Sequence, residues 1–195
     1  MKYCEKDFID RIQDILSTRE RRVIELPPFS RAAVLVPLFK KGEDCHLLFT
    51  KRSEEVKYHK GEISFPGGVA DEEDSELIST ALREAFEEIG LKENDVQVIG
   101  VLDDIVTTTE FIVTPIVGLF PYPYPFKISQ VEIAELIEVP LSFLLSGDNL
   151  SQREIFRGDQ NEIIYFYQYG THTIWGATAR ILKQFLDLIS SGRKG

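Results

Sequence analysis

The feature of this 195-residue chain that most limits its fold is the stretch FPGGVADEEDSELISTALREAFEEIGL, residues 65–91. Two adjacent glycines follow a proline, which predicts a tight loop. Apolar residues then recur every three or four positions up to Gly90, which predicts an amphipathic helix over residues 75–90. A loop, a helix and a second loop are therefore expected in this order. The buried face of the helix is expected to carry Ile78, Leu82, Ala85, Phe86 and Ile89.

The same helix carries three glutamates, Glu84, Glu87 and Glu88, in a sector roughly opposite the apolar one. Like charges three and four residues apart on a helix repel each other, whereas Arg83 can pair with Glu87 four positions later. Hard cations such as Mg²⁺ bind carboxylates together with water and substrate phosphates. On these residues alone, a solvated acidic surface and a divalent metal site are both compatible with the pattern.

The composition excludes several classes of protein. A net charge of -10 argues against nucleic acid held on a basic surface, because phosphate contacts require Lys and Arg. No segment resembles a signal peptide or a membrane span. The two cysteines, Cys4 and Cys45, lack metal-binding or redox spacing and are typical of reduced thiols in a cytoplasmic protein. We therefore expect a cytoplasmic protein with neither nucleic-acid nor membrane partners.

The rest of the chain predicts an α+β fold in a single domain, residues 1–195. Residues 1–30 are expected to form a helix and an arm, and the helix could pack in cis or form a homodimer surface. The run RERR, residues 19–22, is expected to be a solvated charged patch. Pro37 suggests an edge or a bulge in the first strand. Strands are expected at 32–39, 45–52, 95–106, 111–120 and 134–141, with a hairpin over 153–170 and a last helix over 175–189.

The loop and helix resemble the signature of the Nudix hydrolases, G-x5-E-x7-R-E-U-x-E-E-x-G-U, where U is an aliphatic residue. The chain matches the second half of this pattern from Arg83 to Leu91, with Ala85 as a small apolar residue. Asp74 stands at the position of the first glutamate, and one extra residue separates it from Arg83. The resemblance implies an α/β/α sandwich with a mixed β-sheet, a catalytic loop-helix-loop, and N-terminal and C-terminal helices.

A second motif is similar to the signature of one Nudix subfamily, the coenzyme A pyrophosphatases, L-L-T-x-R-[SA]-x3-R-x3-G-x3-F-P-G-G. Residues 48–68 match it except at Phe49 and Lys57. Lys57 replaces an arginine, which keeps the charge but loses bidentate geometry. The resemblance implies cleavage of coenzyme A, or a derivative, to 3′,5′-ADP and 4′-phosphopantetheine. The alternatives are another nucleotide substrate (ADP-ribose, a dinucleotide or a nucleoside triphosphate), a silent nucleotide-sensing domain, or an interaction domain with a solvated acidic helix.

The resemblance also implies roles for individual residues. Glu84, Glu87 and Glu88 are the expected ligands of Mg²⁺ or Mn²⁺, together with the backbone carbonyl of Gly68, and Arg83 is expected to orient Glu87. The general base is either a helix glutamate or Glu132, and the weaker candidates are Glu135 and Glu110.

Substrate contacts are expected just before and within the Gly-Gly turn. Lys57 is the candidate partner of the 3′-phosphate of coenzyme A. Trp175 is expected to anchor the last helix by packing rather than to stack on a ligand. The expected substrate-binding residues are Arg52, Lys57, His59, Gly67 and Gly68.

Overall fold

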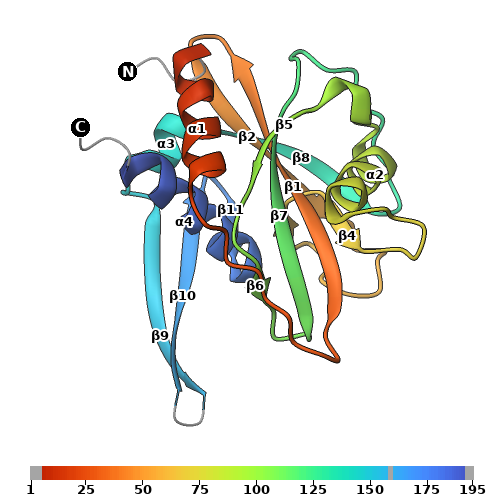
Figure 1. Cartoon of the computed structure of the whole chain (residues 1–195), viewed down its shortest axis with the longest axis vertical. Helices are drawn as coiled ribbons and strands as arrows, with labels where there is room; N and C mark the ends of the chain where they lie inside the picture. Colours follow the sequence, from red (N-terminus) through yellow and green to blue (C-terminus); the bar gives the residue numbers. More distant parts are fainter. Residues whose placement is uncertain (1–5, 158–159, 192–195) are drawn as a thin grey trace.

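The computed structural model describes residues 6–157 and 160–191, which form four α-helices, eleven strands and a 3₁₀ turn (Figure 1). The helices are α1 (Lys6–Thr18), α2 (Leu77–Ile89), α3 (Leu141–Leu145) and α4 (Gly176–Ser191), and the 3₁₀ turn is η1 (Glu93–Asp95). The strands are β1 (Ser30–Lys41), β2 (Asp44–Arg52), β3 (Ile63–Ser64), β4 (Gly67–Val69), β5 (Gln97–Val101), β6 (Ile105–Val106), β7 (Phe111–Leu119), β8 (Ile133–Pro140), β9 (Leu150–Arg157), β10 (Gln160–Tyr169) and β11 (His172–Trp175).

The central sheet is mixed and has eight strands. Its main path runs β3-β2-β1-β7-β5, while β4 pairs with β1, β6 with β7 and β8 with β2. Strands β1 and β7 run parallel, and the other pairs in this sheet are antiparallel. A second sheet has the order β11-β10-β9, and its β9–β10 hairpin extends away from the body of the molecule (Figure 1).

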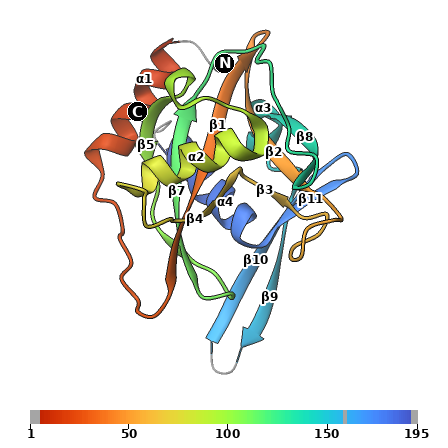
Figure 2. The ribbon, with the colours of Figure 1, turned by 90° about the vertical axis from the view of Figure 1, so that its right-hand side faces the viewer.

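Strand β1 lies at the centre of the sandwich, and its side chains alternate between two cores. Ala33, Leu35 and Phe39 pack in the cluster that includes helix α2, whereas Val36 and Leu38 belong to the larger cluster with α1 and α4. Helix α2 therefore covers one face of the sheet, and α1 and α4 cover the other (Figures 1 and 2). This arrangement confirms the predicted α/β/α architecture with a mixed sheet.

Pro37 does not mark an edge strand, because β1 has neighbours on both sides. Along one side, β1 pairs with β4 up to Val34 and with β2 from Leu38 onward. Pro37 has no N–H group and lies between these two ladders. The prediction of an edge or a bulge is therefore wrong, because Pro37 lies where β1 changes its partner strand.

The arm between α1 and β1 is held by a buried carboxylate. Asp104 is 3% exposed, and its oxygens lie 2.7 Å from the guanidinium of Arg21 and 3.3 Å from that of Arg31. It also accepts hydrogen bonds from the Thr114 hydroxyl and a backbone amide of the arm. Arg19 pairs with the neighbouring Asp103. The prediction of a solvated patch over residues 19–22 is therefore wrong for Arg19 and Arg21.

Helix α1 packs in cis. Its apolar residues are buried in the larger core, and Leu16 lies directly against Gly100 of β5. Arg11 donates a hydrogen bond to the carbonyl of Ile189 in α4, at 3.3 Å. Of the two packing modes left open by the sequence, the structure shows the intramolecular one. No helix within residues 6–157 and 160–191 is both long and apolar enough to cross a membrane.

Cys45 in β2 is fully buried and disulfide-bonded. The prediction of a reduced thiol at this position is therefore wrong. Cys4 lies outside the described residues.

Candidate active site

Helix α2 begins two residues later than predicted, at Leu77, and Gly90 ends it in the left-handed conformation with φ 71°. Two assignments to its faces are wrong. Phe86 is 54% exposed, whereas Glu88 is only 2% exposed. The reason is that α2 contacts two surfaces: the sheet through Ala85 and its neighbours, and strand β4 together with the end of β2 through Glu88. A prediction that gives α2 one apolar face cannot account for both of these contacts.

Glu88 is a buried carboxylate with incomplete partners. Its Oε1 lies 3.7 Å from a guanidinium nitrogen of Arg52, and its Oε2 is buried without a hydrogen-bond partner among the described residues. The pKa of Glu88 is raised to about 8. Burial is the main cause and the nearby Glu84 and Glu132 contribute, while Arg52 and the Gly67 amide oppose the shift. Glu88 therefore holds its proton more tightly than an ordinary glutamate.

Glu84 lies directly against the glycine loop. A Cβ atom added at Gly68 would come within 2.4 Å of Glu84 Cδ, so only glycine leaves room for this carboxylate. Arg83 donates a hydrogen bond to Glu84 Oε1 at 2.8 Å. Burial raises the pKa of Glu84. Arg83 partly offsets this shift, whereas the charges of Glu87 and Glu132 add to it. The loop and the helix thus bring Gly68 and Glu84 together, and their role as metal ligands stays a prediction.

Asp74 is the main partner of Arg83. Its two oxygens accept bonds from Arg83 Nε at 3.1 Å and Nη2 at 3.0 Å, and Thr80 donates to it at 2.9 Å. The guanidinium holds the pKa of Asp74 well below its usual range. Arg83 reaches Glu87 only at 3.3 Å, and Glu87 is about half exposed. Arg83 therefore links Asp74 to Glu84 more closely than it orients Glu87.

If Glu84 binds a metal ion as the sequence predicts, Asp74→Asn is expected to lower turnover by about ten- to a hundredfold, the usual effect of losing a group that orients a metal-binding side chain. The amide keeps the shape of the carboxylate but loses one acceptor and the charge that holds Arg83. Steady-state kinetics at saturating Mg²⁺ would measure the loss, with the exposed Asp71→Asn as the matched control. Wild-type turnover in Asp74→Asn would show that Arg83 needs no fixed partner.

Of the three candidate bases outside the helix, Glu132 is the one that faces the carboxylate cluster. It raises the pKa of both Glu84 and Glu88, and its carbonyl accepts a hydrogen bond from the Ser53 amide at 2.7 Å. Glu135 lies instead 3.5 Å from His172, and Glu110 is in the turn before β7 with φ 63°.

Within the described ranges, no three His, Cys, Asp or Glu side chains are grouped closely enough to form a complete metal site. Arginines hold the carboxylates in their present positions: Arg83 bonds to Glu84 and Glu87, and Arg52 faces Glu88. The donor set nevertheless suits a hard cation. The buried Oε2 of Glu88 has no partner, and mutual repulsion among the carboxylates would be relieved by positive charge.

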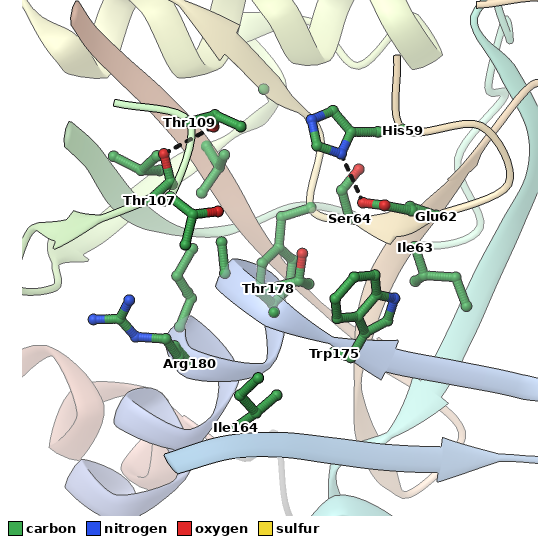
Figure 3. Close-up of a pocket in the computed structure, with 18 of the residues that line it drawn as sticks. His59, Glu62, Ile63, Ser64, Thr107, Thr109, Ile164, Trp175, Thr178 and Arg180 are labelled. Atoms are coloured by element: carbon green, nitrogen blue, oxygen red, sulfur yellow. Dashed lines mark hydrogen bonds and ion pairs between the residues drawn. The ribbon is translucent and has the colours of Figure 1, made fainter. Parts of the chain in front are cut away.

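A cavity of about 340 Å³ opens beside Arg52 and Gly67 (Figure 3). Its walls come from β3, the loop 107–109, strand β10 and the start of α4. Trp175 is 45% exposed and lines this cavity, so its predicted role as a packing anchor is wrong. Lys57 is exposed, lies outside the lining and places its ammonium 5.0 Å from the ring centre of Tyr58.

The predicted substrate-binding residues therefore divide into two groups. Arg52, His59 and Gly67 line the cavity, and His59 bonds to Glu62 at 2.9 Å. Gly68 faces Glu84 instead. The lining residues of loop 107–109 and of β10 lie beyond both motifs, and no spacing pattern in the sequence pointed to them.

Comparison with known proteins identifies the family. The family model described as NUDIX domain matches residues 29–121. An uncharacterized Nudix hydrolase NudL of Photorhabdus laumondii is 40% identical over 183 residues, covering 94% of this chain and 96% of that protein. The Yersinia pestis NudL is 38% identical over 188 residues, covering 94% of each chain.

Solved structures support the fold. A MutT protein from Methanosarcina mazei has a TM-score of 0.51 and 21% identity, covering 91% of this chain and 100% of that one. A MutT/nudix family protein from Enterococcus faecalis has a TM-score of 0.52 and 14% identity, covering 96% of this chain and 76% of that one. The loop, the carboxylate helix and the extensive identity lead to one conclusion: this chain belongs to the Nudix hydrolases and acts on the pyrophosphate bond of a nucleoside diphosphate derivative.

Proposed function

We propose that this enzyme cleaves the diphosphate of coenzyme A or a derivative, releasing 3′,5′-ADP and 4′-phosphopantetheine or its acyl form. The observation that carries the proposal is that the second motif and the carboxylate helix meet at one place. Arg52 and Gly67 belong to the motif and line the cavity, and both also contact Glu88. A diphosphate at this junction would have the cavity on one side and the metal-binding carboxylates on the other.

The chain's own residues fit a reaction that depends on Mg²⁺ or Mn²⁺. Glu84, Glu87 and Glu88, with the carbonyl of Gly68, would hold the cation. When bound, it supplies charge neutralisation at the phosphate oxygens and a water of lowered pKa. Arg52 would bind a phosphate oxygen in place of its long contact with Glu88. A helix glutamate or Glu132 would accept the proton of the attacking water.

Cation binding is expected to release close to one proton per site near pH 7. The pKa of Glu88 is raised to about 8, so its carboxyl is largely protonated at pH 7 and must ionise before it binds a metal. Apparent Mg²⁺ affinity should therefore rise with pH up to about 8 and level off above it. Calorimetry in two buffers of different ionisation enthalpy would count the protons, and an affinity unchanged between pH 6 and pH 9 would contradict the assignment.

The direct test is hydrolysis of coenzyme A, ADP-ribose, a dinucleotide and nucleoside triphosphates, each with Mg²⁺, with Mn²⁺ and with EDTA, with products identified by mass. We expect metal-dependent release of 3′,5′-ADP from coenzyme A well above turnover of the other compounds. Preferential cleavage of another compound would keep the metal site but overturn the substrate. No cleavage of any compound by the folded protein would favour a nucleotide-sensing domain.

A further inference from the structure

We propose that the N-terminus of helix α4 forms a binding site for a phosphate monoester, which on coenzyme A is the 3′-phosphate. The identity of the ligand rests on the proposed function, whereas the site itself rests on the geometry of the cavity. Gly176, Ala177 and Thr178, the first turn of this 16-residue helix, all line the cavity (Figure 3).

The first turn of α4 has no side-chain cap. The indole of Trp175 contains no hydrogen-bond acceptor, and Gly176, whose φ is 64°, has no side chain. The first N–H groups of a helix have no partner within the helix, and those of Ala177 and Thr178 belong to this first turn. These donors and the positive end of the helix dipole therefore face the cavity and favour an anion.

Thr178 supplies a second and independent indication. Its side chain is 9% exposed and contributes to the lining, yet its hydroxyl makes no hydrogen bond to the part of the chain that the structure describes. The hydroxyl oxygen is not among the fully buried unpaired atoms of the described residues, so it opens onto the cavity. A phosphate oxygen in the cavity would provide that partner.

The charges nearest the helix end suit a dianion. Arg180, also in the lining, donates one bond to the Val106 carbonyl at 2.9 Å and keeps other N–H groups for a ligand. Thr107 and Thr109 add hydroxyls from the loop beside it (Figure 3). Two carboxylates also line the cavity: Glu62, which is paired with His59, and Glu162 of β10. The whole chain has a net charge of -10 and would repel a phosphate, so the local donors of Arg180, Thr107 and Thr109 are needed to attract it.

The same cavity reaches Arg52 and Gly67 beside the carboxylate helix. Coenzyme A carries its 3′-phosphate on the ribose that also bears the diphosphate, so one ligand can occupy both ends. Lys57, the partner that the sequence suggested for this phosphate, lies outside the lining. The N-terminus of α4, and not Lys57, therefore determines the preference of the enzyme for coenzyme A over dephospho-coenzyme A.

The test compares adenosine 3′,5′-bisphosphate with 5′-AMP by calorimetry on the full chain without divalent metal, so that it requires no turnover. We expect the bisphosphate to bind about tenfold more tightly or better. Thr178→Val keeps the shape but removes the hydroxyl, and should reduce this preference by about tenfold, the effect of one hydrogen bond to a charged group. The same change at exposed Thr173 on β11, outside the lining, is the matched control.

Thr178→Asp provides a second variant that should fold. An acidic residue in the first turn stabilises a helix, but here it would put a carboxylate where the phosphate binds, and the preference should disappear. Equal affinity of the wild type for both nucleotides would overturn the proposal. A preference lost in Lys57→Ala but kept in Thr178→Val would also overturn it.

The two proposals can fail separately. If coenzyme A is not cleaved but the bisphosphate preference depends on Thr178, the anion site stands and the assigned reaction falls. If coenzyme A and dephospho-coenzyme A are cleaved with equal kcat/KM and the two nucleotides bind equally, the reaction stands and the anion site falls.

Discussion

Glu88→Gln is expected to lower turnover by about a thousandfold while making the metal-free protein more stable at pH 8 and above. The loss of activity follows if Glu88 binds the cation, because an amide is neutral and cannot replace an ionised ligand in stabilising developing charge. The gain in stability follows from the burial of this side chain, which is only 2% exposed. The same group would then be essential for function and unfavourable for folding.

The direction of the stability change follows from the pKa. Burial is the main reason that the pKa of Glu88 is raised from its ordinary value of 4.5 to about 8, so the folded state binds the proton more tightly than the unfolded state. Its contribution to stability is therefore complete below about pH 4.5 and is lost as the pH rises through about 8. Glutamine carries no charge at any pH and avoids this loss, which amounts to at most about 5 kcal/mol.

Thermal unfolding of the metal-free proteins between pH 5 and pH 9 would test this prediction. We expect the Tm of the wild type to fall relative to that of Glu88→Gln as the pH rises, and saturating Mg²⁺ to restore only the wild type. Glu72→Gln, in the exposed loop before α2, controls for the loss of one negative charge. Parallel pH profiles, or metal-dependent turnover retained by Glu88→Gln, would contradict this account of Glu88.

Sequence periodicity predicted the elements whose burial is simple. The spacing of apolar residues located α1, α2 and the strands around Ala33 and Leu47, because each of these elements packs against one core or alternates between two. It failed for Phe86 and Glu88, where α2 contacts a second surface formed by β4 and Arg52. Helical periodicity predicts which face of a helix is buried on average, and it does not show whether a second face contacts another part of the protein.

The motif spacing predicted the carboxylate helix better than the residues that support it. Asp74 follows an irregular acidic loop, and only the structure shows that its carboxylate forms a two-point pair with Arg83.

The cavity could not be predicted from the sequence for a different reason. Its walls combine β3, the loop 107–109, β10 and the start of α4, which are far apart in the sequence and meet only where β10 and β11 pack against α4 and β11 against β3.

Gly67→Ala is expected to destabilise the protein by about 3 kcal/mol or more, whereas Gly68→Ala should leave the fold nearly intact. A Cβ atom at Gly67 would lie 2.4 Å from the Ala33 carbonyl oxygen and 2.6 Å from Val34 Cα. Both are backbone atoms of the central strand β1, which is fixed by β7 on its other side and cannot move away. A loss of this size is a large part of the total stability of a typical domain.

The added methyl group at Gly68 meets a different obstacle. The atoms within 2.6 Å of it are the carboxylate carbon and oxygens of Glu84, the end of a flexible side chain that can rotate away. Gly68→Ala should therefore keep its denaturation midpoint within about 1 kcal/mol of the wild type but lose turnover by about a hundredfold, because Glu84 no longer reaches its position beside the loop. Chemical denaturation combined with kinetics on both variants separates the two glycines. If Gly67→Ala is stable, or if Gly68→Ala is as active as the wild type, the close packing of β4 between β1 and α2 does not have the role that its geometry indicates.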